Sequence, residues 1–227
     1  MSNRDNGIWT ASKFVPPPNT PPEDVFGSTE MWETFGTAHR FLIRPQHVPH
    51  IAPPKTLAIY IDGACFDNGT PNSLGGVGFV FNAIPQQGTV SFALEKEGPV
   101  GNVHQHTNNR AELRAAIAAL EFRAWYMAFN KLVLITDSEY VANGATTWIR
   151  TWAAQGWNTT ASKSVANRDL WEKLILEMKQ YADGGCDVSF WAVPREWNQQ
   201  ADQAAKDGAG RTDGCVSYSP VHVSIQH

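Results

Sequence analysis

Two short apolar runs, each followed closely by an aspartate, constrain the fold of this chain most strongly. Leu57–Ile61 runs into Asp62, and Leu132–Ile135 is followed after one threonine by Asp137. Short, continuous apolar runs of this kind are typical of strands that are buried on both faces, as in parallel sheets covered by helices. If the two strands are parallel neighbours, both carboxylates emerge at the edge where ligands bind in open α/β sheets.

The remaining periodicities complete a mixed α/β pattern. Further strands are predicted at Gly75–Phe81, Thr89–Leu94 and Val188–Val193, and helices at Asn108–Asn130, Asn167–Tyr181 and Glu196–Asp207, with short helices in the Trp-rich segment Val141–Trp157. The order is β-β-β-α-β-α-α-β-α. A hairpin-connected start followed by βα units predicts a mixed sheet with helices on its faces.

Residues 1–55 differ in character from the rest. Proline pairs and triplets punctuate this segment, which favours extended or irregular backbone. Two interpretations stay open: a linker, or an arm that packs its apolar residues on the main domain. Those residues are Met31, Trp32, Phe35, Phe41, Leu42 and Ile43. We therefore expect a Pro-rich N-terminal extension (1–55), one full-size globular domain (56–210) and a C-terminal tail (211–227).

Charge and cysteine usage exclude several classes of protein. The net charge of −4 argues against a binder held by a diffuse basic surface, although an enzyme can grip phosphates locally. The three isolated cysteines predict neither a disulfide framework nor a zinc site, and fit a reducing compartment. The sequence has no apolar run of membrane-spanning length and no signal peptide at its polar start. We expect an intracellular protein, cytoplasmic or nuclear and not secreted, without membrane contact or a small-molecule cofactor.

Four carboxylates, Asp62, Glu112, Asp137 and Asp202, are the candidate catalytic residues. Close anions repel each other unless divalent cations such as Mg²⁺ compensate them. Two such ions can activate a water and stabilise the leaving oxygen of a phosphodiester. Each residue alone has an ordinary interpretation: a turn for Asp62, a helix cap beside Asp137, and solvated positions for the other two. The prediction depends on their combination and order.

The chain resembles type 1 ribonuclease H from about residue 57 to residue 208. The segments that carry the resemblance, in order, are Tyr60–Cys65, Thr107–Leu113, Ile135–Ser138, Trp148–Trp152, Gly156–Trp157, Asn167–Trp171 and Asn198–Asp202. The resemblance implies a three-layer fold whose five-stranded mixed sheet has the order 3-2-1-4-5 with strand 2 antiparallel. It also implies hydrolysis of the RNA strand of RNA/DNA hybrids, with two Mg²⁺ ions, or Mn²⁺ as a substitute, held by the four carboxylates.

The same resemblance implies the residues that contact the hybrid. Asn108 and Asn109, together with Gly63, Cys65 and Asn68, match positions on the RNA side; amides there can sense a 2′-hydroxyl because they both donate and accept. Thr107 and Asn167 match residues that hold a phosphate of the DNA strand. Trp148 and Trp152 match the handle segment that lines the DNA channel, although aromatics at this spacing are more often core residues. We expect a monomer.

Three departures from the family pattern stand out. Gln105 occupies a position where many members have arginine, and the handle turn Ala153–Gln155 lacks the usual cations, which predicts a shallower salt dependence. Many members carry a catalytic-loop histidine near the last carboxylate, whereas this chain has an Arg-Glu-x-Asn pattern beginning at Arg195. An arginine stays protonated and cannot act as a base, but it can stabilise charge on a phosphate.

Three alternatives stay open at this point. A hybrid- or RNA-binding module without activity agrees with the missing histidine, but has no need of four carboxylates. A 3′–5′ exonuclease on a related sheet usually has Asp-x-Glu on the first strand, where this chain has Asp62-Gly-Ala64. A domain derived from a polyprotein is the third.

Overall fold

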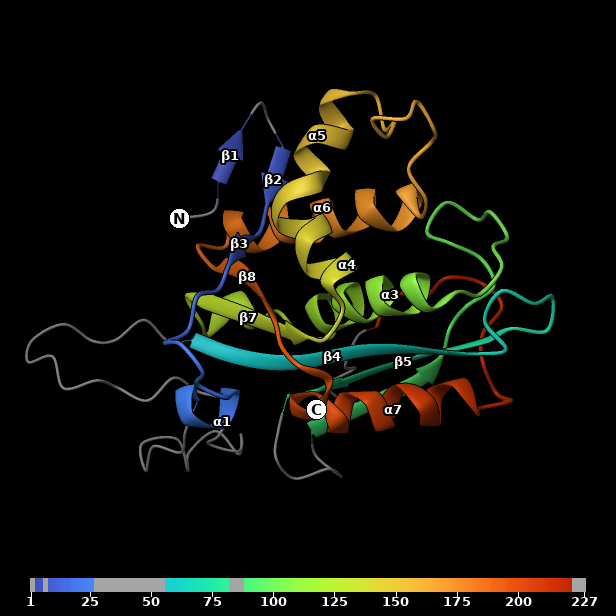
Figure 1. The fold of residues 1–227 in the computed structure, drawn as a ribbon, viewed down its shortest axis with the longest axis horizontal. Coiled ribbons are helices and arrows are strands. Elements are labelled where there is room, and N and C mark those ends of the chain that lie inside the picture. Colours follow the sequence, from blue (N-terminus) through green and yellow to red (C-terminus); the bar gives the residue numbers. More distant parts are fainter. Residues whose placement is uncertain (1–2, 6–7, 27–55, 82–87, 222–227) are drawn as a thin grey trace, which may run out of the picture.

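A six-stranded mixed sheet lies at the centre of the protein (Figure 1). The computed structural model describes residues 3–5, 8–26, 56–81 and 88–221. Along the sheet the order is β3-β8-β7-β4-β5-β6, in which β5 is antiparallel to both neighbours and β3, β8, β7 and β4 are parallel. The strands are β3 (Ser12–Lys13), β4 (Thr56–Phe66), β5 (Leu74–Val80), β6 (Thr89–Ala93), β7 (Lys131–Thr136) and β8 (Asp187–Ala192). A separate two-stranded ribbon consists of β1 (Asn3–Asp5) and β2 (Ile8–Thr10).

The prediction of a five-stranded sheet is wrong in its strand count. The sixth strand, β3, comes from the N-terminal segment, where Ser12 pairs with Ser189 at the outer edge of β8. The two hydroxyl groups also lie 2.7 Å apart, within hydrogen-bonding distance. A two-residue strand has no recognisable apolar alternation, so the sequence pattern could not show that the N-terminal segment satisfies the edge of β8.

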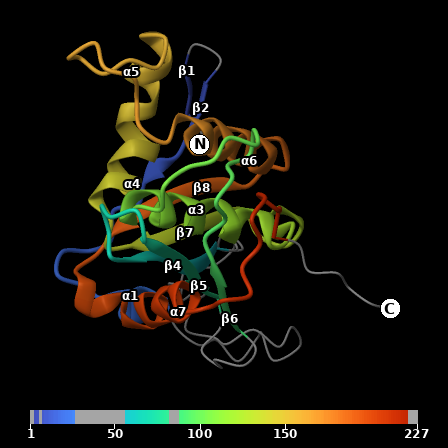
Figure 2. The same cartoon turned by 90° about the vertical axis from the view of Figure 1, so that its right-hand side faces the viewer.

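Helices cover both faces of the sheet (Figures 1 and 2). One face carries α3 (Asn108–Glu121), α4 (Glu139–Asn143) and α6 (Arg168–Asp183); the other carries α1 (Pro22–Val25) and α7 (Gln199–Ala209). A π-helical stretch, Gly144–Trp148, joins α4 to α5 (Ile149–Ala154), which projects away from the sheet. Within the described part of the chain, no helix combines the length and apolar character that a membrane crossing requires.

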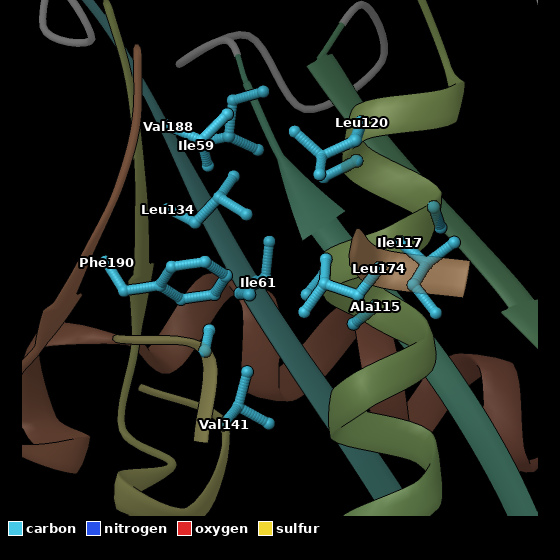
Figure 3. Close-up of a cluster of buried hydrophobic side chains, with 14 of the residues drawn as sticks. Ile59, Ile61, Ala115, Ile117, Leu120, Leu134, Val141, Leu174, Val188 and Phe190 are labelled. Carbon is cyan, nitrogen blue, oxygen red and sulfur yellow. The ribbon is translucent and has the colours of Figure 1, made fainter. Parts of the chain in front are cut away.

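The main core lies between the sheet and α3 (Figure 3). Alternate residues of β4, including Ile59 and Ile61, point toward Ile117 and Leu120 of α3. Leu134 of β7 and Phe190 of β8 extend the same layer, and all these side chains are buried. Burying each such side chain contributes roughly 1.5–3 kcal/mol, so this layer fixes α3 against the centre of the sheet.

The opposite face of the sheet is shared between two elements. The alanine-rich helix α7 packs on β4, β5 and β6, and its buried residues are small. Over β7 and β8 the cover comes from the N-terminal segment, where the rings of Phe14 and Phe26 lie 5.3 Å and 6.2 Å from that of Trp191. Phe26 is fully buried. Residues 12–26 therefore pack on the sheet, whereas the apolar residues from Met31 to Ile43 lie outside the described residues.

Helix α3 ends nine residues earlier than the predicted Asn130. It stops at Glu121, and a 3₁₀ turn, Trp125–Met127, follows. The bend brings the Trp125 ring into the core, where its indole N–H donates to the carbonyl of Ala119 at 3.0 Å. The Tyr181 hydroxyl lies 2.8 Å from another terminal carbonyl, that of Leu120. These side chains satisfy the carbonyls that a longer helix would have bonded internally.

A buried arginine, Arg114, fastens the C-terminal segment to α3. Its guanidinium pairs with Glu95 at 2.8 Å and Glu121 at 3.1 Å, and donates to the backbone carbonyl of Ser219 at 2.8 Å. The Tyr218 ring lies 4.3 Å from the guanidinium carbon, and its hydroxyl donates to Glu121 at 2.6 Å. Residues 218–221 are therefore held against the domain, whereas residues 211–217 are exposed.

Candidate active site

The site begins where β4 and β7 stop pairing. Their parallel ladder ends at Tyr60 opposite Ile135, and Asp137 follows directly after β7. The sequence pattern predicted that the first strand ends at Asp62. This prediction is wrong, because β4 continues to Phe66 along β5. Both carboxylates nevertheless lie at the same end of the parallel pair, the usual ligand-binding edge of such sheets.

Gly63 brings the third carboxylate to this edge. A Cβ atom at Gly63 would lie 2.0 Å from the backbone nitrogen of Glu112, so any side chain would push the start of α3 away from β4. Glu112 is then held by two donors: the Asn108 amide at 2.8 Å and the Ser138 hydroxyl at 2.5 Å. The glycine predicted to contact nucleic acid thus has a clear packing role.

Asp202, on the first turn of α7, faces two cations. Arg195 contacts one of its carboxylate oxygens and Lys206 the other. Arg195 is more than half exposed, with a relative side-chain accessibility of 69%, whereas Asp202 is at 15%. The fourth predicted carboxylate and the predicted Arg195 are therefore neighbours.

All four carboxylates line one cavity of about 160 Å³. Its other walls are formed by the β4 backbone, by Asn108 and by the two cations; the lining residues are Asp62, Gly63, Ala64, Cys65, Phe66, Asn108, Glu112, Asp137, Arg195, Asp202 and Lys206. The cavity is small and strongly polar. It suits ions and a phosphate group better than an apolar ligand.

The electrostatics of the cavity divide its acids into two kinds. Burial, followed by the charge of Asp137, raises the pKa of Asp62 to about 8. Burial and Asp137 also raise the pKa of Glu112, against the opposing hydrogen bond from Ser138. Burial would raise the pKa of Asp202 too, but Lys206 and Arg195 outweigh it and hold that pKa below its usual value. The buried acids repel each other, whereas Asp202 is neutralised locally.

Within residues 3–5, 8–26, 56–81 and 88–221, no three acidic, histidine or cysteine side chains are gathered closely enough to form a metal cluster. Each of three acids in the cavity accepts a hydrogen bond from the protein. The Asn198 amide donates to Asp137 at 2.7 Å, Ser138 to Glu112, and Lys206 to Asp202. The donor set still fits divalent cations, since carboxylate oxygens are their preferred ligands and a cation would remove the repulsion around Asp62.

The residues predicted to contact RNA lie along the rim of this cavity. Cys65 and Asn108 line it directly. Asn68 lies on the turn after β4, and its side-chain oxygen accepts from the Asn108 backbone N–H at 3.3 Å. Asn109 is exposed on the first turn of α3. The structure thus brings both asparagines of the helix start and the β4–β5 turn to one place.

Thr107 and Asn167, the residues predicted to hold a DNA phosphate, are the N-terminal caps of α3 and α6. Both are bonded to Arg110: Thr107 Oγ1 accepts from its backbone N–H at 3.2 Å, and Asn167 Oδ1 accepts from its guanidinium at 3.4 Å. Although they lie 60 positions apart in sequence, both contact one residue: Thr107 accepts from the backbone N–H of Arg110 and Asn167 from its side chain.

Trp148 and Trp152 lie together in an aromatic cluster beside α6. Their ring centroids are 5.7 Å apart, and Trp152 stacks edge-on against the buried Trp171 at 5.5 Å. Trp148 has a relative accessibility of 37% and is the more exposed of the pair. Trp152 is thus tied to the core, whereas Trp148 keeps a face available to a ligand.

Asn198 and Lys206 received no role from the sequence. Asn198 is buried and joins the middle of β4 to Asp137, since its amide also donates to the carbonyl of Ile61 at 3.1 Å. Lys206 follows Asp202 by four residues on α7. That spacing places the two side chains on one helix face and was a usable signal.

Comparisons with known proteins agree on one family. The sequence profile of the RNase H family matches residues 54–210. Ribonuclease H of Rhodopseudomonas palustris strain TIE-1 is 41% identical over 157 residues, which cover 69% of this chain and 91% of that protein. Ribonuclease H of Treponema pallidum subsp. pallidum is 42% identical over 171 residues, or 72% of this chain and 96% of the other.

A solved structure gives the same result. LC9-RNase H1, described as a type 1 RNase H with the type 2 active-site motif, superposes with a TM-score of 0.52 at 27% identity, covering 70% of this chain and 74% of the other. The family profile spans well over half of the chain, and the sequence relatives are covered over most of their length. The protein therefore belongs to the RNase H family.

Proposed function

We propose that this protein cleaves the RNA strand of RNA/DNA hybrids endonucleolytically, leaving 5′-phosphate and 3′-hydroxyl ends. One observation carries the proposal: Asp62, Glu112, Asp137 and Asp202 line a single small polar cavity where the parallel pairing of β4 and β7 ends. Ribonucleases H generally depend on divalent metal ions. A non-catalytic binder gains nothing from four carboxylates facing a phosphate.

The four carboxylates would hold two Mg²⁺ ions, or Mn²⁺ in their place. When bound, such ions activate the attacking water and neutralise charge on the phosphate that is cleaved. The protein's own part is orientation. Ser138 and Asn108 fix the carboxylate of Glu112, and Asn198 fixes that of Asp137, so that both side chains are held before substrate arrives.

Arg195 takes the place of the family's catalytic-loop histidine in the Arg-Glu-x-Asn variant to which we assign the chain. Its contact with Asp202 puts a permanent positive charge at the mouth of the cavity. Because a guanidinium does not release its proton at physiological pH, Arg195 would stabilise charge on the phosphate and would not transfer a proton. Without a side-chain acid–base group, the proposed enzyme would be slower than histidine-containing members, by up to about 10²–10⁴-fold.

The hybrid would lie across the starts of α3 and α6. The RNA strand would contact Gly63, Cys65, Asn68, Asn108 and Asn109, and the DNA strand would contact Thr107, Asn167, Trp148 and Trp152. The handle contributes few cations, and Arg150 is engaged by Thr10 at 2.7 Å. We therefore expect the logarithm of the affinity to fall only shallowly with the logarithm of the salt concentration.

For the whole chain we propose a monomer that works inside the cell, in the cytoplasm or nucleus. Its three cysteines are all free thiols, which suits a reducing compartment. We retain the division into an extension (1–55), a ribonuclease H domain (56–210) and a tail (211–227), with residues 12–26 and 218–221 packed on the domain.

The test is cleavage of a labelled hybrid in Mg²⁺ or Mn²⁺ by the parent and by Asp137→Asn. Internal cuts in a hybrid with a blocked RNA 3′ end are expected from the parent, and a loss of at least about 10³-fold from the variant, because a metal-binding carboxylate is removed. Asp183→Asn is the control, since Asp183 is exposed on α6 and pairs with Lys179.

Other outcomes separate the alternatives. Binding of the hybrid without cleavage in either metal would support the inactive module, which is favoured by one observation: Arg195 and Lys206 occupy Asp202. Release of single nucleotides from an unblocked 3′ end only would support an exonuclease. Equal cleavage by Asp137→Asn would refute the assignment of the site.

A further inference from the structure

We propose that the Arg110 side chain is a positioning residue for the DNA-strand phosphate, acting by holding Asn167 as a hydrogen-bond donor beside the Thr107 hydroxyl. The inference rests on the proposed hybrid substrate and deepens it. Arg110 lies in the third position of α3 and is 2% exposed. A side chain so deeply buried cannot itself reach a phosphate, so its effect must pass through its neighbours.

The first neighbour is Thr107, the cap of α3. Its Oγ1 accepts a hydrogen bond from the Arg110 backbone N–H at 3.2 Å. A hydroxyl has one proton to donate and lone pairs that accept. With an acceptor site used inside the helix, the Thr107 proton remains available to an oxygen outside, and a phosphate has only acceptor oxygens.

The second neighbour is Asn167, the cap of α6. Its Oδ1 accepts from the Arg110 guanidinium at 3.4 Å, which fixes which end of the amide faces the protein. The amide nitrogen then points the other way, with one hydrogen directed to the Tyr140 hydroxyl at 3.4 Å and the second available to a ligand. The left-handed backbone of Asn167, with φ of 56°, fixes the starting point of this side chain.

Asp169 holds Arg110 in the required orientation. The guanidinium forms a bidentate pair with Asp169 at 3.0 Å and 2.7 Å, and His104 lies 3.4 Å from the same carboxylate. Burial alone would raise the pKa of Asp169, but the hydrogen bonds and charge of Arg110 hold it below its usual value. The loop before α3 is closed over the pair, since a Cβ at Gly98 would lie 2.1 Å from an Asp169 oxygen.

The arrangement joins two helix starts. Figure 1 shows the first turns of α3 and α6 on the same side of the molecule, beside the green loop that joins β6 to α3. The positive ends of both helices face this place, which favours an anion. One residue thus satisfies the inward acceptors of two caps on different helices, Thr107 through its backbone N–H and Asn167 through its guanidinium, and leaves both with outward donors.

The experiment replaces one DNA phosphate at a time with a neutral methylphosphonate and measures kcat and KM on each hybrid. The parent is expected to show a raised KM at one DNA position. Arg110→Lys keeps the charge but loses the planar fork. It should raise KM roughly tenfold on the unmodified hybrid, as loss of a hydrogen bond to a charged group does, with kcat within about twofold. It should also reduce the methylphosphonate effect, because the contact with Asn167 is lost while Thr107 still accepts from the backbone N–H.

Two further variants keep the test decisive. Arg114→Lys is the matched control, since Arg114 is equally buried on the same helix and paired with carboxylates, but contacts neither cap. It should lower the melting temperature and leave the methylphosphonate effect intact. Asn167→Gly, which tolerates the positive φ, should reduce the effect to the same extent by itself, and Arg110→Lys should then add nothing. Asp169→Asn carries the same test if Arg110→Lys does not fold.

Two results would overturn the proposal: a full methylphosphonate effect in folded Arg110→Lys, or an equal reduction of that effect in Arg114→Lys. Failure of the proposed function looks different, because the parent would then cleave no hybrid at all. A parent that cleaves hybrids but is insensitive to every DNA methylphosphonate would leave the function standing and refute the inference.

Discussion

Arg110 and Arg114 lie one turn apart on α3, and both are almost completely buried. Arg110, near the helix start, shares its charge with a single carboxylate and keeps its remaining contacts for two helix caps at the surface. Arg114, in the middle, is surrounded by two carboxylates, an aromatic ring and a backbone carbonyl. The contacts of Arg110 position residues at the surface, whereas those of Arg114 hold buried elements together.

The difference shows that burial of an arginine does not define its role. The Arg114 cluster is extended by Lys173, which lies 3.0 Å from Glu121 and also contacts Glu177. Glu121 alone has partners from α3, α6 and the C-terminal segment. The partners of Arg110, in contrast, include two half-buried helix caps that are partly open to solvent. We expect damage at Arg114 to appear in stability and damage at Arg110 to appear in substrate binding.

The largest effect is expected from Arg114→Ala. It leaves Glu95 and Glu121 buried without their cation, which typically costs about 3–5 kcal/mol. At about 2–4 °C per kcal/mol, thermal melts should show a melting temperature lower by roughly 6–20 °C. KM for a hybrid, measured where the variant is folded, should stay within about twofold. A large rise in KM without loss of stability would reverse the comparison.

An intermediate effect is expected from Asp169→Asn, and it should depend on pH. The pKa of Asp169 is lowered in the folded protein, so its pairing with Arg110 stabilises the fold above the unfolded-state pKa of about 3.9 and is lost as pH falls through the folded pKa. Loss of the charged pair should cost about 1.5–3 kcal/mol at neutral pH. Melting curves of parent and variant should differ by a constant amount above about pH 5 and converge below about pH 4.

Charges that face Asp169 from other elements provide the check. They are Arg110 on α3 and His104 on the preceding loop. Burial and the charge of Arg110 lower the pKa of His104, so this histidine gains its proton only in acid. A difference between parent and Asp169→Asn that grows as the pH falls below the unfolded-state pKa would contradict the prediction.

The smallest effect is expected from Tyr218→Phe. The change removes one hydrogen bond to Glu121 while the ring keeps its place over Arg114. The loss should be about 1 kcal/mol, or roughly 2–4 °C in the melting temperature, with hybrid cleavage unchanged. An unchanged melting temperature would mean that the Tyr218 hydroxyl contributes nothing and that the tail is held by its ring and backbone contacts.

Much of the candidate site could be predicted because it follows short-range rules. Apolar runs located β4 and β7, and the residues after them located Asp62 and Asp137. The pairing of β3 with β8 could not be predicted, since two residues carry no periodicity. The early end of α3 was missed because helical spacing continues past Glu121, while a distant tyrosine and a buried tryptophan decide where the helix stops. The pairing of Arg110 with Asp169 could not be predicted either, because the two residues lie 59 positions apart in sequence.

The strand β3 has a practical consequence for where the folded domain begins. Similarity to the family begins at residue 54, yet the outer edge of β8 and the pocket of Phe26 are occupied by residues 12–26. A chain trimmed to the family boundaries would expose a row of unpaired backbone groups beside an uncovered aromatic surface, which is the geometry that promotes edge-to-edge association. The region that matches the family is therefore shorter than the region that folds. An expression clone limited to the matching region would lack part of the folded domain.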